Sequence, residues 1–136
     1  MGNCIFCDLI QGQIPCEKIY ETEHVLAFMD IHPGVEGHVL VVPKKHSENI
    51  FDIDSEGLVH VMEAAKQLAI VLKRVLHCDG MNIFQSNGAV AFQSVFHFHI
   101  HLLPRRETDM VRLPWIPKAS VAHELKELAN KIRAGF

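Results

Sequence analysis

The sequence has no apolar run long enough to cross a membrane. Its first residues, Met1-Gly2-Asn3-Cys4, also lack the charged-then-apolar pattern of a secretory signal. Gly2 raises the question of N-myristoylation, but position 6 is Phe rather than Ser or Thr, which argues against it. We therefore expect a cytoplasmic protein with no membrane partner.

Long basic runs, repeats and low-complexity linkers are also missing from the sequence. The formal net charge is −3, which together with the missing basic run argues against a dedicated nucleic-acid surface. At 136 residues the chain has the length of one domain and is long enough to bury a single core. We expect one domain over residues 1–136, with no nucleic-acid partner.

Cysteine is used sparingly, with four residues, of which Cys4 and Cys7 form a C-x-x-C pair. In a reducing compartment such a pair binds metal or does redox work more often than it forms a structural disulfide. A thioredoxin-like site would need a preceding strand, and the three residues before Cys4 leave no room for one. The pair therefore indicates a metal site, whereas Cys16 and Cys78 are expected as buried or surface thiols.

The sequence does contain a stretch in which histidine alternates with large apolar residues, Phe96-His97-Phe98-His99-Ile100-His101-Leu102. Successive side chains of a strand point to opposite faces. The three histidines therefore share one face, and the four apolar residues share the other. We expect the apolar face to pack into a core and the histidine face to carry the chemistry.

On an untwisted strand the three imidazoles cannot all bind one zinc ion. Neighbours on one face lie roughly 6.5–7 Å apart, so the outer two are roughly 13 Å apart, whereas a zinc–nitrogen bond is only about 2.0–2.1 Å long. At least one histidine must have another role. A neutral imidazole can attack phosphorus or accept a proton, and crowding keeps part of the array neutral near pH 7. The stretch supplies a nucleophile beside a possible acid.

The other periodicities predict an α+β fold. Apolar residues recur at spacings of three and four from Leu58 to Leu76, which predicts a long helix capped by Asp54 or Ser55 and ended by Asp79-Gly80. A helical turn is expected over 8–12, and a last helix capped by Ser120 after an irregular segment. Strands are expected over 18–21, 24–30, 38–42, 81–86 and 93–103, the first three as an antiparallel meander and the last ended by Pro104.

Together these motifs resemble the histidine triad (HIT) family. The stretch 93–103 fits its signature of three histidines alternating with apolar residues, and the segments 4–7, 27–33, 37–46 and 87–88 match in order. The resemblance covers about residues 3–106 and leaves 107–136 as a C-terminal extension. It implies a five-stranded antiparallel sheet with one long helix, in a homodimer whose sheets join into ten strands. Members are nucleotidyl hydrolases or transferases acting on nucleoside phosphoramidates, dinucleoside polyphosphates and related adenylates.

The resemblance also implies roles for individual residues. His99 would attack the α-phosphorus and form a nucleotidyl-histidine intermediate, which water then hydrolyses. His101 would contact the phosphate and help to protonate the leaving group, and His38 would line the same pocket. The remaining expected contacts are with a purine nucleotide, an AMP or GMP moiety: Asn87, Gln93 and Ser94 near phosphate or leaving-group oxygens, Asp30 at the ribose hydroxyls, and Ile5, Phe6, Phe28 and Ile31 around the base.

A structural zinc ion needs four ligands, of which the C-x-x-C pair supplies two. From the residues alone, His46 and one histidine of the alternating stretch could complete the set, although other histidines compete. Zinc-bearing members of the family match this chain at Cys4, Cys7, His46 and His97. The resemblance therefore implies a structural zinc held by these four residues.

One position departs from the family pattern, because Ala91-Phe92-Gln93 stands where the family has Ala-Gly-Gln. Phenylalanine adopts a positive φ less readily than glycine, so we expect the loop near the phosphate to run differently. Two other interpretations remain open at this point. One is a non-catalytic purine-nucleotide-binding module, favoured if the Phe92 loop blocks the phosphate, and the other is a hydrolase with catalytic zinc on the histidine face. Trp115 and Arg105 or Arg106 could touch the leaving group.

Overall fold

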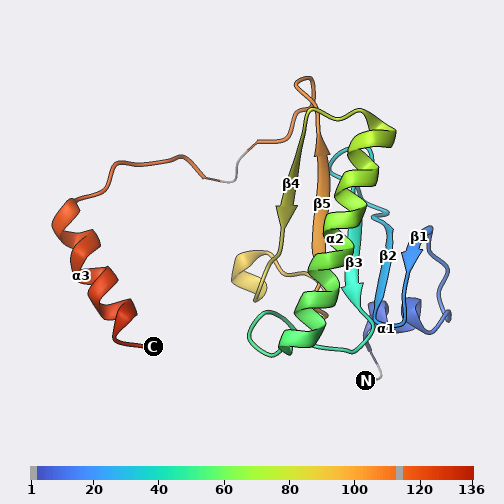
Figure 1. Cartoon of the computed structure of the whole chain (residues 1–136), viewed down its shortest axis with the longest axis horizontal. Coiled ribbons are helices and arrows are strands. Elements are labelled where there is room, and N and C mark those ends of the chain that lie inside the picture. Colours follow the sequence, from blue (N-terminus) through green and yellow to red (C-terminus); the bar gives the residue numbers. More distant parts are fainter. Residues whose placement is uncertain (1–2, 113–114) are drawn as a thin grey trace.

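The structure is a computed structural model that describes residues 3–112 and 115–136. It has one antiparallel sheet with three helices and a short 3₁₀ helix, η1 (Figure 1). The elements follow in the order α1 (Ile5–Ile10), β1 (Lys18–Glu21), β2 (Val25–Met29), β3 (Val39–Pro43), α2 (Ser55–Leu76), β4 (Gly80–Phe84), η1 (Ala89–Ala91), β5 (Ile100–Arg105) and α3 (Ala122–Arg133). The expected α+β fold with a five-stranded antiparallel sheet is confirmed.

The sheet has the strand order β1-β2-β3-β5-β4, and all its pairings are antiparallel. The first three strands form the expected meander. The chain then crosses the sheet through α2, adds β4 at the far edge, and returns through β5 between β3 and β4. β5 therefore lies inside the sheet, next to the β4 edge, although it is the last strand in the sequence. Among the described residues no helix is both long and apolar enough to span a bilayer.

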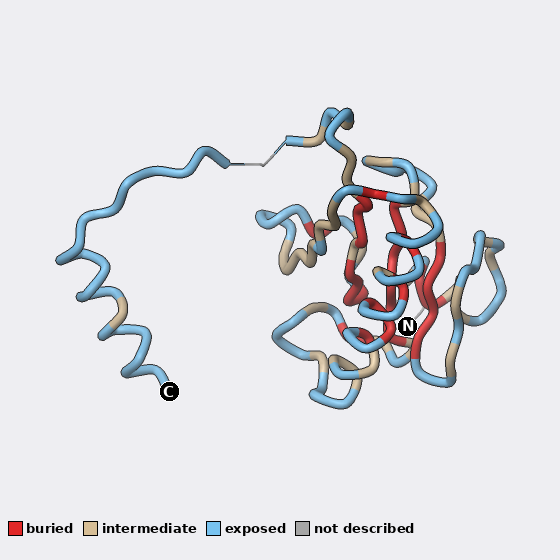
Figure 2. Tube along the Cα trace, turned by 45° about the horizontal axis from the view of Figure 1, so that its top comes forward, coloured by how far each residue is buried: buried red, intermediate tan, exposed pale blue. Residues whose placement is uncertain are grey.

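Alternation along the strands gives the sheet two buried faces (Figure 2). One face packs against α2, whose residues Val61, Ala65 and Leu68 contact strand residues of alternate positions. The other face carries a second apolar cluster, in which Phe6 from α1 packs with Leu26, Phe28, Leu40 and Val42. The core lies on the α2 side, so the α1 side is the face on which a site can open.

The histidine stretch differs in detail from the strand predicted over 93–103. Phe98, Ile100 and Leu102 are buried against α2, as expected, but Phe96 is 45% exposed and does not join the core. β5 begins only at Ile100, so the first two histidines precede the strand. Pro104 does not end it: the residue pairs with β4, and the ladder to β3 stops at Leu102, so the missing N–H breaks no bond to β3.

The ends of the helices show where local signals were sufficient. Asp54 caps α2, as predicted, by accepting a hydrogen bond from the N–H of Gly57 at 2.7 Å. The helix ends at Leu76 because His77 takes the left-handed conformation (φ 52°), and Gly80 already belongs to β4, which corrects the predicted ending. α3 starts after Val121 with no side-chain cap, so the predicted cap by Ser120 is wrong.

The N-terminal helix also differs from its prediction. α1 begins at Ile5 rather than near residue 8, because the Sγ of Cys4 accepts a hydrogen bond from the N–H of Cys7 and caps the helix. The first cysteine of the C-x-x-C pair thus precedes the helix and the second lies in its first turn.

The segment after β5 leaves the body of the molecule on the side of β4, and α3 lies apart from the sheet (Figures 1 and 2). No residue of α3 is buried.

Candidate active site and metal centre

A cavity of about 530 Å³ opens on the α1 side of the sheet. Its lining comes from α1, the loop after it, the ends of β2 and β3, the residues just before the histidine stretch, and β5. Nine residues expected at a nucleotide site line it: Ile5, Phe6, Phe28, Asp30, Ile31, His38, Ser94, His99 and His101. The structure thus brings together residues that lie up to 96 positions apart in the sequence.

His99 presents a free lone pair to this cavity. Its Nδ1 lies 2.7 Å from the carbonyl oxygen of His97. Because a carbonyl oxygen can only accept a hydrogen bond, Nδ1 must carry the proton, which leaves the lone pair on Nε2. Burial lowers the pKa of His99, so the ring is neutral near pH 7. A neutral imidazole with an unprotonated Nε2 at a cavity is a competent nucleophile.

A second hydrogen-bonded chain fixes the proton positions of His38 and His101. The N–H of Gly34 donates to Nδ1 of His38 at 3.0 Å, so the neutral His38 ring carries its proton on Nε2. That Nε2 lies 2.8 Å from Nδ1 of His101 and 3.4 Å from a carboxylate oxygen of Asp30. Nδ1 of His101 therefore accepts, and its proton sits on Nε2.

Burial is the main cause of the low pKa values in this group. It lowers the pKa of His38, while the charge of Asp30 acts in the opposite direction. It also lowers the pKa of His101 to about 4, with smaller contributions from the neighbouring rings of His99 and His38. In the absence of a bound anion, all three rings are neutral near pH 7.

Asp30, His38 and His101 lie close enough together to suggest a cation site. The hydrogen bonds do not fit one. The N–H of Gly34 fixes the proton of His38 on Nε2, which is the nitrogen that would have to face the ion. The expectation of a catalytic zinc ion on the histidine face therefore has no support in this group.

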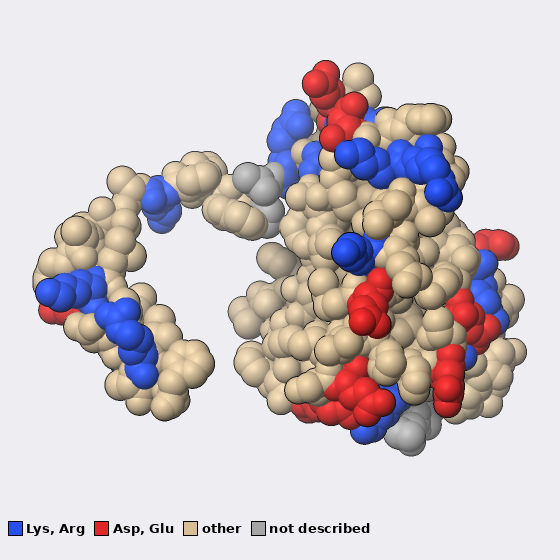
Figure 3. Space-filling model, viewed as in Figure 1, with Lys and Arg blue, Asp and Glu red and all other residues tan. Residues whose placement is uncertain are grey.

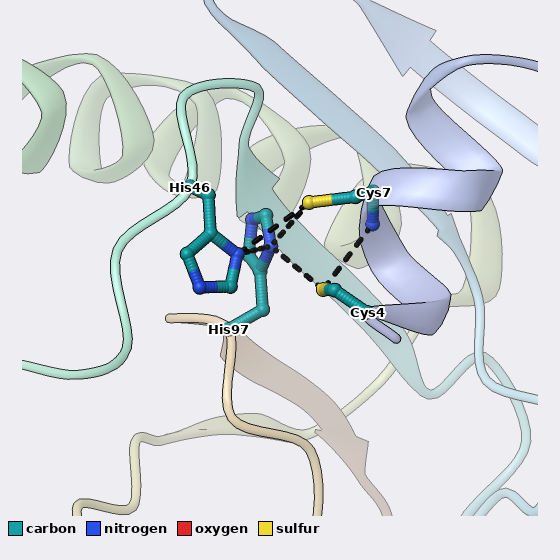
Figure 4. Close-up of side chains that lie close together, drawn as sticks. All are labelled: Cys4, Cys7, His46 and His97. Atoms are coloured by element: carbon teal, nitrogen blue, oxygen red, sulfur yellow. Dashed lines mark hydrogen bonds between the residues drawn. The ribbon is translucent and has the colours of Figure 1, made fainter. Parts of the chain in front are cut away.

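Cys4, Cys7, His46 and His97 form a separate cluster (Figure 4). Nδ1 of His97 lies 3.3 Å from Sγ of Cys4, 3.6 Å from Sγ of Cys7 and 3.1 Å from Nδ1 of His46. Nε2 of His97 lies 2.8 Å from the carbonyl oxygen of Pro43 and must carry the proton, so the Nδ1 lone pair points at the cluster. Four donor atoms thus converge from α1, the loop after β3 and the histidine stretch.

This donor set fits a zinc ion. Tetrahedral zinc with bonds of about 2.0–2.3 Å separates its ligand atoms by about 3.3–3.8 Å, close to the distances within the cluster. Burial, followed by the hydrogen bond and charge of Cys4, raises the pKa of Cys7 to about 11, so without a cation the thiol stays protonated. A bound zinc ion would reverse this effect, because ligating thiols are deprotonated.

Two residues expected at the nucleotide do not line the cavity. Gln93 is buried, and its amide bonds to the carbonyl oxygens of Glu48 and Val95 and to the N–H of Gly88. Asn87 accepts hydrogen bonds from the N–H of Ile50 and from Gln85, and donates back to Gln85. Both side chains hold the loop before the histidine stretch instead.

Phe92 takes the conformation that we expected it to avoid. Its φ is 71° and its ψ 17°, the left-handed region normally occupied by glycine, and its side chain is 82% exposed. The loop therefore does not have to run differently, and Phe92 is not among the residues that line the cavity. The strain is tolerated because the ring points into solvent and hinders nothing.

The C-terminal candidates also lie outside the cavity lining. Arg105 forms an ion pair of 2.7 Å with Asp109, and Arg106 donates to the carbonyl oxygen of Leu76, so both hold the chain after β5. Trp115 is 60% exposed.

Some contributors to the site were not predicted. Gly34 and Pro43 act through backbone atoms, which fix the protons of His38 and His97. Cys16 and Val95 line the cavity, although Cys16 was expected only as a buried or surface thiol. The sequence does not show which backbone group a histidine ring will meet, whether it lies four positions away, as Gly34 does, or 54, as Pro43 does. An apolar lining residue looks like any core residue.

We next compared the chain with known proteins. A model of the HIT domain matches residues 11–108. The chain belongs to the HIT family. An adenosine 5′-monophosphoramidase of Candida albicans is 35% identical, with 97% of this chain and 90% of the relative covered.

Two solved HIT structures show the same fold. A HIT family protein from Bacillus anthracis is 40% identical, covers 99% of this chain and 98% of its own, and superposes with a TM-score of 0.91. A zinc-bound histidine triad family protein from Mycobacterium smegmatis is 32% identical, covers 98% of both chains and has a TM-score of 0.78.

Proposed function

We propose that this HIT protein is a nucleotidyl hydrolase or transferase that cleaves nucleoside phosphoramidates or dinucleoside polyphosphates at the α-phosphate. The observation that carries the proposal is the unprotonated Nε2 of His99, which is held by the carbonyl of His97 and opens onto the cavity. The Candida albicans relative, named as an adenosine 5′-monophosphoramidase, supports the choice of a phosphoramidate substrate.

In the first step Nε2 of His99 bonds to the α-phosphorus, and the bond from phosphorus to the leaving nitrogen or oxygen breaks. An anionic phosphate in the cavity favours the protonated form of a neighbouring imidazole, so on substrate binding His101 takes up a proton from solvent and then passes it to the leaving group. In the second step water attacks phosphorus, the P–N bond to His99 breaks, and the proton of water passes to His101. The free nucleotide then leaves.

The lining of the cavity suits the rest of a nucleotide. Phe6 and Phe28 meet edge to face with ring centroids 5.4 Å apart, and with Ile5 and Ile31 they offer an apolar slot for the base. One oxygen of Asp30 accepts the N–H of His32 at 2.8 Å, which fixes the carboxylate for the ribose hydroxyls. Ser94 lines the same cavity and would contact phosphate or leaving-group oxygens. Asn87 and Gln93 are left out of the proposed contacts because their amides are already bonded within the loop.

The cluster of Cys4, Cys7, His46 and His97 would hold a structural zinc ion. Four protein ligands leave no open position for water, so the ion would fasten α1 to the histidine stretch rather than act in the reaction. The zinc-bound structure of the Mycobacterium smegmatis relative supports this proposal.

We also propose the homodimer. β4 is an edge strand of the sheet, with Ile83 47% exposed. Pairing of two β4 edges would satisfy their free backbone groups and join the sheets into ten strands.

The non-catalytic alternative was favoured only if the Phe92 loop blocked the phosphate, and Phe92 is not among the residues that line the cavity. The decisive experiment traps the intermediate. The protein is mixed with adenosine 5′-phosphoramidate, quenched at alkaline pH within milliseconds, and measured by intact mass and peptide mapping. We expect one adenylyl group on His99, none in His99→Ala, and normal labelling in His123→Ala, a histidine on the exposed face of α3. Normal turnover without an adduct at His99 would refute the intermediate, and no turnover of either substrate class would refute the function.

A further inference from the structure

The C-terminal helix is the part of the molecule that the proposed chemistry does not explain. Three leucine and isoleucine residues, Leu125, Leu128 and Ile132, follow at spacings of three and four and are 54–58% exposed. They form one face of α3, and no residue of α3 is buried. A helix of 12 residues is marginal in water without a packed apolar face. In the folded protein this face must therefore be covered.

The body of the molecule offers a matching uncovered surface on α2. Beyond its buried face, α2 exposes five apolar side chains by 41–60% each: Val59, Met62, Ile70, Val71 and Val75. Figure 3 shows charged side chains of both signs on this side of the molecule, with uncharged surface between them. Five exposed apolar side chains, interspersed with charged ones, on a helix that already packs a core on its other side are a candidate for a protein contact.

The direction of the C-terminal segment argues against docking on its own body. Figures 1 and 2 both show the chain leaving past the β4 edge and α3 lying beyond it. Residues 107–136 are 30 of 136, more than a fifth of the chain. The Bacillus anthracis structure could not reach a TM-score of 0.91 over 99% of this chain if its C-terminal segment lay elsewhere. The outward course is therefore shared with a crystal structure of a relative.

The space beyond β4 is also where a second copy would lie if two sheets joined through their β4 edges. We propose that α3 is an exchanged arm: it packs its Leu125, Leu128 and Ile132 face on the exposed apolar side chains of α2 in a second copy of this chain. The inference rests on the dimer proposed above and not on the chemistry of the cavity. Two arms would be exchanged in each dimer, so that each copy covers an apolar surface of the other.

Site-specific photo-crosslinking tests the exchange. Leu128 is replaced by p-benzoylphenylalanine in the full-length protein, and Asn130, which lies on the opposite side of α3, is replaced in the same way as the matched control. After irradiation we expect position 128 to give a product of twice the chain mass on a denaturing gel, with the crosslink in α2. Position 130 should give at least about fivefold less.

A crosslink within a single chain, a crosslink outside α2, or equal yields at the two positions would overturn the proposal. A second measurement covers the case in which the bulky residue displaces the arm. Amide hydrogen exchange of α3 should be slow in the unmodified protein and in Asn130→Asp, and at least tenfold faster in Leu128→Asp. Equal exchange in the two variants would contradict the docked face. Neither measurement needs turnover, so hydrolysis by the unmodified protein tests the proposed function separately.

Discussion

His97 and His99 lie two residues apart on the same side of the chain, yet they serve two different groups of residues. Each ring donates one N–H to a backbone carbonyl, but through opposite nitrogens: Nε2 of His97 bonds to Pro43, and Nδ1 of His99 bonds to His97. The free lone pair of His97 consequently points at two thiols, and that of His99 points at the cavity. In each ring a single backbone acceptor decides which nitrogen keeps its lone pair, and so which group of residues that lone pair faces.

The surroundings of the two rings reinforce this difference. His97 is fully buried among Cys4, Cys7 and His46 and does not line the cavity that His99 faces. His99 is also buried, but Phe6 covers only one side of it, with ring centroids 5.1 Å apart, and the other side faces the cavity. The comparison predicts different effects of substitution. Substitutions in the cluster around His97 should lower the stability of the protein, and substitutions around His99 should lower its catalytic activity.

The largest effect is expected from His99→Ala, which removes the proposed nucleophile. We expect kcat/KM for adenosine 5′-phosphoramidate to fall at least about 1,000-fold, or about 4 kcal/mol. The melting temperature and the zinc content should stay close to those of the unmodified protein. His123→Ala is the control and should keep full activity. A fall in kcat/KM of less than tenfold in His99→Ala would contradict the proposed role of His99 as the nucleophile.

Cys7→Ser tests the other side of the comparison. It removes one of four proposed zinc ligands, so we expect zinc, measured by atomic emission, to fall from about one per chain to a small fraction. The free energy of unfolding should drop by about 3 kcal/mol, and Tm by about 10 °C.

Cys78→Ser is the matched control, because Cys78 is another buried free thiol and lies outside the cluster. It should keep its zinc and lose about 1 kcal/mol. An unchanged zinc content in Cys7→Ser would contradict the proposed zinc site.

A smaller effect is expected from Asp30→Asn, which keeps the shape of the side chain but removes its charge. If the carboxylate holds the ribose, kcat/KM should fall about 10- to 30-fold, mainly through KM. A 2′-deoxy substrate should lose a similar factor with the unmodified protein and little more with the variant, because the same contact is missing. Independent, additive losses would show that Asp30 acts on His38 rather than on the sugar.

The smallest effect is expected from Phe92→Gly, in the loop just before the histidine stretch. Relief of the left-handed conformation gains about 1–2 kcal/mol, and the greater freedom of glycine in the unfolded chain offsets about half of this. Tm should rise by about 2 °C with kcat/KM unchanged within twofold. Val90→Gly, an exposed neighbour without a positive φ, is the control and should lower Tm slightly. A lower Tm in Phe92→Gly would show that the ring stabilises the loop.

The sequence was sufficient wherever neighbouring residues decide the structure. The amphipathic spacing placed α2 and the Asp54 cap, and the β-branched runs placed β1 to β3. Prediction failed where distant segments decide. Pro104 stays within β5 because the β3 ladder stops at Leu102, and His77 ends α2 although a glycine lies three residues later. Phe92 accepts a strained backbone because the surrounding loop fixes it.

The sequence by itself determined which residue types were available: three alternating histidines, a C-x-x-C pair and an acid at the end of an apolar strand. It could not assign protons to the ring nitrogens, because these depend on the backbone group that each ring meets in the fold: the distant Pro43 for His97, and the nearby Gly34 and His97 for His38 and His99. Alternation along an extended chain is a local property, and it survives in the structure. The bond from His97 to Pro43 joins distant segments, and His99 bonds to a carbonyl two residues away only because the fold turns its ring that way. Only the tertiary structure therefore set the lone pair of one histidine toward sulfur and that of the next toward the cavity.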